Sequence, residues 1–207
     1  MLRSRQLFNL GLLVCTLLSV SALFAKDKKV MPAEKGSSPT SYRFNEYKVD
    51  FPGNWQAISD NDLKSYLGYY QRATSSSPYW SDPSFVRGWS EIGSKNARLS
   101  MCTIYKTKNE RKLSRDIYVK AILERYSLKD SGMKDVKVQA NGEATISGAS
   151  AKWFDVQMVT QDQKIKVRHY VFIVGEQVYY FYFSTTPKHF SKVKDQFETI
   201  ANSFNVQ

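Results

Sequence analysis

The chain has 207 residues, a formal net charge of +11 and two cysteines. A chain of this length can bury a core of its own. So few cysteines exclude a fold held together by a disulfide framework.

The first residues have the three parts of a secretory signal. Arg3 and Arg5 provide a positive start, residues 7–24 form an apolar run, and small residues close it. We expect a signal peptide over residues 1–25 that is cleaved after Ala25, or alternatively after Ala22. An uncleaved membrane anchor is the other interpretation, although the apolar run is near the lower limit for spanning a bilayer. The sequence therefore predicts an exported protein, periplasmic or extracellular.

The positive charge has a different meaning in an exported protein than in a cytosolic one. We expect an envelope protein or an anionic envelope component as the partner, with no nucleic acid and with membrane contact that is at most peripheral. A solvated basic surface without a partner is the alternative, because no window contains five or six adjacent lysines and arginines. Nothing in the sequence indicates oligomerisation, and we expect a monomer.

Residues 26–41 are polar and rich in proline, glycine and serine, which predicts a flexible linker. One domain follows over residues 42–207. It opens with a strand in which Tyr47, Val49 and Phe51 alternate with charged residues, and Pro52-Gly53 ends that strand. The spacing of apolar residues then predicts a helix over residues 59–70.

Residues 71–97 are the least regular part of the chain, and we expect a long loop there. Loops of this length in compact domains are either functional or folded back on the core. Aromatic and arginine side chains dominate binding hot spots, so the sequence offers a candidate partner-binding set, against the alternative that these aromatics pack inward: Arg72, Tyr79, Trp80, Phe85, Arg87 and Trp89.

The rest of the chain reads as a strand, a helix and an antiparallel meander. The strand covers residues 99–106 and contains Cys102, which we interpret as a small buried hydrophobe. The helix covers residues 114–128, with Ser114 as its N-cap. The predicted meander has strands at residues 136–139, 143–147, 151–159, 164–174 and 177–185.

Residues 178–184 are apolar or aromatic at both alternating sets of positions. A strand of this kind in an antiparallel sheet must be covered on both faces, which places it in the middle of the sheet. Thr186 and Pro187 then begin a helix with an apolar stripe: Phe190, Val193, Phe197, Ile200 and Phe204. The expected fold is α+β, a single domain with an antiparallel sheet of about six or seven strands sandwiched between helices.

Three segments carry a family resemblance. They are the strand end FPGNW (residues 51–55), the hairpin EATISGASA (143–151) and the terminal IANSF (200–204). In this order they resemble the PsbP-like superfamily, which includes photosystem II extrinsic proteins, Ran-binding relatives and DcrB-type bacterial envelope proteins. The resemblance spans residues 42–206 and implies a sheet between helices and an accessory or binding role rather than an enzymatic one. Residues 71–97 have no counterpart in the family pattern.

No catalytic motif is recognisable in the sequence, and we expect no enzyme activity, no cofactor and no metal. His169 and His189 lie in neighbouring elements and could share a metal with Asp155 or Asp195, but no metal-ligand spacing supports this. An uncharacterised hydrolase, with His169 in a polar pocket beside a nucleophile, is the remaining enzymatic alternative.

Overall fold

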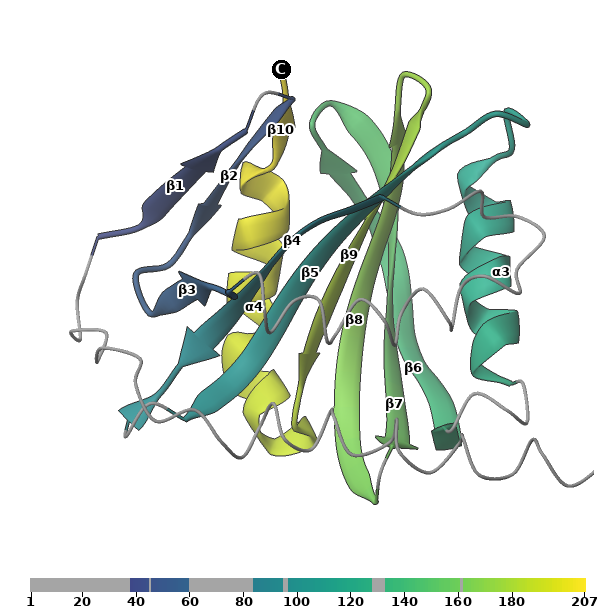
Figure 1. Cartoon of the computed structure of the whole chain (residues 1–207). Coiled ribbons are helices and arrows are strands. Elements are labelled where there is room, and N and C mark those ends of the chain that lie inside the picture. The colour runs from purple at the N-terminus through teal and green to yellow at the C-terminus, as the bar shows by residue number, and fades with distance from the viewer. Residues whose placement is uncertain (1–37, 45, 60–83, 95–96, 128–132, 161) are drawn as a thin grey trace, which may run out of the picture.

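The structure is a computed structural model that describes residues 38–44, 46–59, 84–94, 97–127, 133–160 and 162–207. These residues form two antiparallel sheets and two helices (Figure 1). The elements in chain order are β1 (Thr40–Arg43), β2 (Tyr47–Phe51), β3 (Trp55–Ala57), β4 (Ser84–Ile92), β5 (Arg98–Lys108), α3 (Arg115–Tyr126), β6 (Met133–Ile146), β7 (Ala149–Thr160), β8 (Gln163–Val174), β9 (Gln177–Thr185), α4 (Pro187–Ser203) and β10 (Asn205–Val206).

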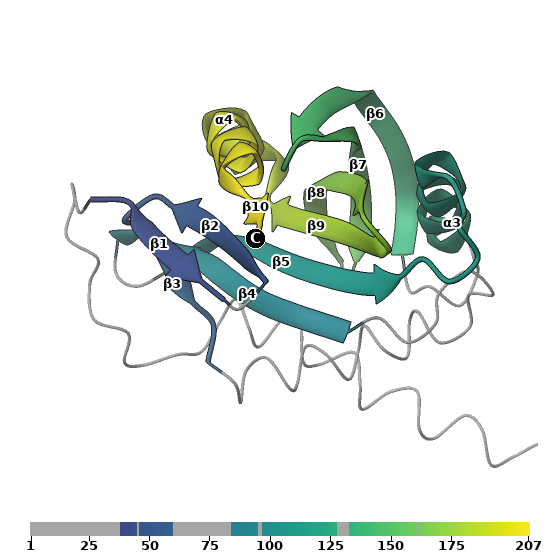
Figure 2. The same ribbon diagram turned by 90° about the horizontal axis from the view of Figure 1, so that it is seen from above.

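The larger sheet has seven strands in the order β3-β4-β5-β9-β8-β7-β6. A smaller sheet has the order β1-β2-β10 and lies on the same side of the large sheet as α4 (Figure 2). Helix α3 covers the opposite side of the large sheet. The predicted α+β fold, with an antiparallel sheet between helices, is confirmed.

Strand β9 lies in the middle of the large sheet, as its composition predicts. Tyr179, Phe181 and Phe183 face α4 and the small sheet. Val178 and Tyr180 face α3. The turn before β9 is also as expected, because Gly175 has a positive φ of 58° in a two-residue hairpin that pairs Val174 with Gln177.

Helix α4 begins as the sequence predicts. Thr186 precedes it, and its hydroxyl accepts a hydrogen bond from the backbone N–H of His189 at 3.3 Å. The ring of Phe197 stacks on Phe183 of β9 at 4.7 Å between centroids. Helix α3 follows Ser114, but the Ser114 side chain makes no capping hydrogen bond.

Two strands differ from the prediction because β-bulges interrupt the alternation of side chains. The two strands expected at residues 136–139 and 143–147 are one strand, β6, with register shifts between Lys134 and Lys137 and between Val138 and Ala140. Gly142 remains inside β6 because the ring of Trp153 occupies the space where a Cβ would lie, 2.8 Å away. Part of the expected loop 71–97 is strand β4, whose register shifts between Phe85 and Arg87.

Other expectations fall on residues that the structure does not describe. These are the signal peptide at residues 1–25, most of the linker and nearly all of the helix at residues 59–70. Strand β1 begins at Thr40, two residues before the expected start of the domain. No helix in the described part of the chain is both long and apolar enough to cross a membrane.

Candidate functional site

The predicted partner-binding residues fall into two groups. Arg72, Tyr79 and Trp80 lie outside the described residues. Phe85, Arg87 and Trp89 belong to β4, where Phe85 is opposite Tyr105 of β5.

Trp89 belongs to the core. Its side chain is fully buried, and its ring stacks on Phe51 at 4.4 Å between centroids. Tyr42 contacts it edge-on at 5.5 Å. Because β4 alternates across the sheet, Trp89 points under the small sheet, and no partner can reach its ring.

Arg87 is exposed and lies against aromatic rings. Its guanidinium sits over the ring of Phe44, 5.7 Å from the centroid. Phe44 stacks on Tyr47 at 4.6 Å, and Tyr47 stacks on Phe204 at 5.1 Å. A column of rings therefore runs from the surface at Arg87 into the core. We call Tyr42, Phe44 and Arg87 the cation–aromatic surface.

Sequence reasoning missed Tyr42 and Phe44. Both are half-buried, which leaves part of each ring accessible to a partner. They flank Arg43 in the stretch before β2, and that pattern is indistinguishable from the start of an ordinary strand. Burial raises the pKa of Tyr42, with hydrogen bonds to Ala57 and Trp89 opposing the shift, so the phenol remains neutral.

His169 is a core residue. It is 4% exposed, its ring stacks on Phe154 at 4.6 Å, and its Nε2 shares a 2.5 Å hydrogen bond with the Tyr126 hydroxyl. Burial lowers the pKa of His169 to about 3, so the ring is neutral near pH 7. An environment of aromatic rings does not match the polar pocket that the hydrolase alternative requires.

His189 lies in the first turn of α4, and its side chain is only 22% exposed. Its Nε2 lies 2.9 Å from Oε2 of Glu91, a buried carboxylate that also accepts a 2.6 Å hydrogen bond from Ser100. The serine hydroxyl donates to the carboxylate and not to the imidazole, so the three groups lack the nucleophile–base order of a catalytic triad. Their effect is to hold the start of α4 against β4 and β5.

A buried ion pair lies where α4 crosses β7 and β8. Arg168 Nε is 2.7 Å from Asp155 Oδ1, and its terminal nitrogen is 3.0 Å from Oδ2. Trp153 covers the guanidinium at 4.4 Å, and Lys166 Nζ lies 3.8 Å from the same carboxylate. Burial disfavours the charged guanidinium, but the hydrogen bond and charge of Asp155 outweigh this and raise the pKa of Arg168. Both oxygens of this carboxylate are therefore engaged within the protein.

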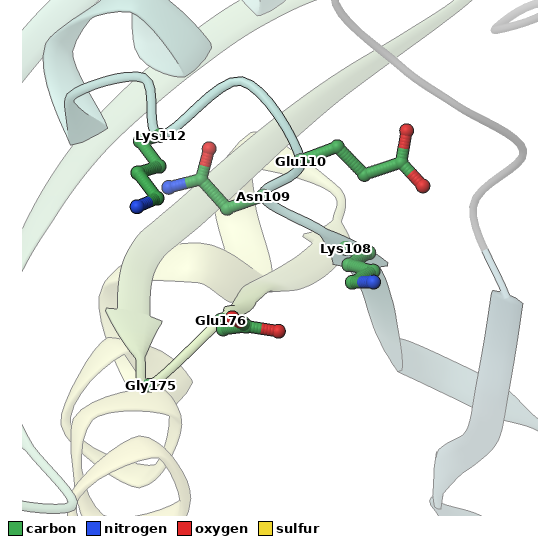
Figure 3. Close-up of a pocket in the computed structure, with 6 residues that line it drawn as sticks. All are labelled: Lys108, Asn109, Glu110, Lys112, Gly175 and Glu176. Atoms are coloured by element: carbon green, nitrogen blue, oxygen red, sulfur yellow. The ribbon is translucent and has the colours of Figure 1, made fainter.

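A surface pocket of about 530 Å³ lies between the β8–β9 turn and the segment that leads from β5 to α3 (Figure 3). The Asn109 side chain in it is committed to structure, since its Oδ1 accepts from the Leu113 N–H and the Tyr118 hydroxyl, each at 2.8 Å. The side chains of Glu110 and Lys112 do not point toward each other (Figure 3). The charges around this pocket do not converge on a common point where a ligand could bind.

Cys102 and the acidic residues offer no metal chemistry in the part of the chain that the structure describes. No three His, Cys, Asp or Glu side chains among these residues lie close enough together to hold a metal ion. Cys102 is fully buried, and burial raises the pKa of its thiol, as expected of a small core hydrophobe.

Comparisons with known proteins support the fold. No protein-family model matches the sequence, and a search of curated proteins finds no match. The chain is similar to the solution structure of cyanobacterial PsbP (CyanoP) from Synechocystis sp. PCC 6803, with a TM-score of 0.57, 12% identity, and 86% of this chain and 98% of that chain covered.

A second similar structure is a protein of unknown function from Pseudomonas aeruginosa. The TM-score is 0.51 at 16% identity, and the match covers 80% of this chain and 94% of that chain. Structural similarity at identities this low establishes the fold and leaves the activity open. The expected PsbP-like fold is confirmed.

The buried His169 predicts a specific pH dependence of stability. The folded protein keeps this ring neutral down to about pH 3, whereas the unfolded chain protonates it near the ordinary value of 6.5. Its contribution to stability is therefore complete above that value and falls by about 1.4 kcal/mol per pH unit as the pH drops through the window below it. His169→Phe should lose this dependence. Urea unfolding of both proteins between about pH 7 and about pH 4 measures it, and parallel curves would contradict the assignment.

For the Asp155–Arg168 pair, we expect that replacing one partner destabilises the protein more than replacing both. Asp155→Asn leaves a buried guanidinium without its bidentate partner and should lower the free energy of unfolding by about 3–5 kcal/mol. Replacing both residues, Asp155→Leu with Arg168→Met, removes both charges and should recover most of that loss. Chemical denaturation of the three proteins tests this. A double variant as unstable as the single one would show that the pair is a net source of stability.

Proposed function

We propose that this chain is an exported, non-enzymatic accessory or binding protein of the bacterial cell envelope. In this proposal its partner contacts the cation–aromatic surface together with the segment that precedes Arg87 in the chain, which contains Arg72, Tyr79, Trp80 and Phe85. The observation that carries the proposal is the exposed Arg87 lying on the half-buried Phe44. Arginine and aromatic side chains held in place by packing are the residues that contribute most to protein–protein binding.

The state of the acid and base groups also supports a binding role. His169 is enclosed by rings, Glu91 is occupied by Ser100 and His189, and Asp155 is occupied by Arg168. A catalytic group must reach substrate, and these groups are committed to partners inside the protein. The PsbP-like fold agrees with an accessory role, and the signal-like residues 1–25 are the basis for export.

A second candidate function is a peripheral binder of membranes or anionic polymers that is driven by charge. Lys188 and Lys192 are exposed one turn apart at the start of α4, and no acidic residue occupies the first turn. Cations at this end of a helix are opposed by the helix dipole and by each other. An anionic surface would neutralise them.

Export has a direct test. The full chain, expressed in a bacterium with a carboxyl-terminal tag, should appear in the envelope or secreted fraction in a shortened form. Sequencing of its amino terminus should begin at Lys26, or at Leu23 for the alternative cleavage site. A full-length chain in the membrane fraction would support the uncleaved anchor, and a full-length cytosolic chain would contradict export.

Partner contact is tested by photo-crosslinking in intact cells. A photoreactive amino acid at position 87 should give a discrete crosslinked product, because Arg87 is exposed within the proposed contact. The same amino acid at Lys120 is the matched control, since this exposed residue lies on α3 at the other side of the molecule (Figure 1). Equal products at both positions, or none at position 87, would contradict the proposed surface.

A further inference from the structure

The outer face of the small sheet places two cations directly opposite each other. Arg43 of β1 pairs in register with Lys48 of β2, so both side chains project from the same face. Asn205 of β10 is the neighbour of Lys48 on its other side and is uncharged. Like charges at directly opposed positions destabilise an antiparallel pair. The repulsion between Arg43 and Lys48 thus occurs on a face of the small sheet that no described element covers.

The acidic residue of this face is already occupied. Asp50 accepts a 2.5 Å hydrogen bond from the Ser41 hydroxyl, and its other oxygen lies 3.3 Å from Lys48 Nζ. The Ser41 bond is the largest cause that lowers the pKa of Asp50, and Lys48 and Arg43 lower it further. Arg43 is exposed and makes no ion pair with any residue that the structure describes. One carboxylate therefore serves two cations.

The cation–aromatic surface lies on the other side of the edge strand β1, because Tyr42 and Phe44 alternate with Arg43 along the chain. Phe44 follows Arg43 in the chain, and Arg87 lies over the Phe44 ring. Lys106 and Glu46 nearby form an ion pair and cancel each other. Arg43 and Lys48 thus lie on one face of the small sheet with Asp50 beside them, and two half-buried aromatic rings border its other face.

We propose that the small sheet, at its edge strand β1, binds an acidic segment of a partner protein, in which carboxylates flank an apolar side chain. The carboxylates pair with Arg43 and Lys48, which relieves the repulsion between them, and the apolar side chain packs on Phe44 and Tyr42. This inference rests on the proposed binding function and specifies the chemistry of its partner.

The number of cations separates a protein segment from other anionic partners. Clusters that bind anionic membranes contain about four to eight lysines and arginines, because each contributes only about 1 kcal/mol near the surface. Arg43 and Lys48, with a carboxylate beside them, are too few for that. A second copy of the chain does not fit either, since pairing two such faces would bring their arginines and lysines together.

The test compares two charge reversals that change the net charge equally. One variant is Arg43→Glu with Lys48→Glu. The control is Lys120→Glu with Lys134→Glu, whose side chains are each 76% exposed and lie on α3 and β6, across the molecule from β1 and β2 (Figure 1). Thermal unfolding confirms that both variants fold.

Two probes are used with the full chain. The first is a short fluorescent peptide with glutamates on either side of a phenylalanine, alongside its glutamine counterpart. The second is a vesicle that contains phosphatidylglycerol. We expect the acidic peptide to bind the wild-type protein and the control with equal affinity, and to bind the Arg43–Lys48 variant about tenfold or more weakly.

Three results would overturn the proposal. They are equal loss of peptide binding in both variants, equal binding of the acidic and glutamine peptides, and binding to vesicles without binding to the peptide. The crosslinking experiment keeps this proposal separate from the proposed function. A crosslink at position 87 without acidic-peptide binding refutes the acidic partner alone, whereas loss of that crosslink refutes the binding function itself.

Discussion

The rest of the structure depends on one constraint, which is that β9 is apolar on both faces. Tyr179, Phe181 and Phe183 on one side and Val178 and Tyr180 on the other are all almost completely buried. An antiparallel strand can bury both sets of side chains only in the middle of a sheet that is covered on both sides. The two cores of the molecule, one under α4 and the small sheet and one under α3, follow from this strand.

Apolar packing explains why α4 binds the sheet, but it does not fix where the helix lies. Hydrophobic contact is not directional, and a stripe that includes Phe190 and Phe197 could slide along the rings beneath it. One polar contact joins the helix to the sheet near its start, the pair of His189 on α4 with the buried Glu91 of β4. A buried charge that loses its partner costs several kcal/mol. The Glu91–His189 pair therefore sets the position of α4 more than it adds to the affinity of the helix for the sheet.

Features with a local signal could be predicted from the sequence. The two faces of β9 and the capped stripe of α4 depend on neighbours within a few residues, and both predictions are confirmed. The bounds of strands β4 and β6 were not predicted, because bulges shift the alternation of inward and outward side chains within each strand. The contact of His189 with Glu91 spans 98 residues, and no local pattern carries it.

The same reasoning applies to the candidate site. Arginine and aromatic content near residue 87 drew attention to β4, and Arg87 is at the surface, whereas Trp89 two residues later is core. Arg87 and Trp89 project to the same face of β4, and composition does not reveal that the small sheet covers Trp89 completely while Arg87 stays exposed. Tyr42 and Phe44 come close to Arg87 only because the small sheet folds over β4. No sequence pattern in either segment predicts this tertiary contact.

Proteins that share this fold can differ in function at surface positions that do not contribute to the core. A likeness at 12% identity preserves the layers of the fold while most side chains differ, so the interior reports the architecture rather than the activity. The informative positions are those where this chain departs from the rules that its own elements otherwise follow. Arg43 opposite Lys48 is one such departure, and the lysines at the positive end of α4 are another. Neither contributes to the core, and both are unfavourable in isolation, so a partner that supplies negative charge is the simplest physical reason for keeping them.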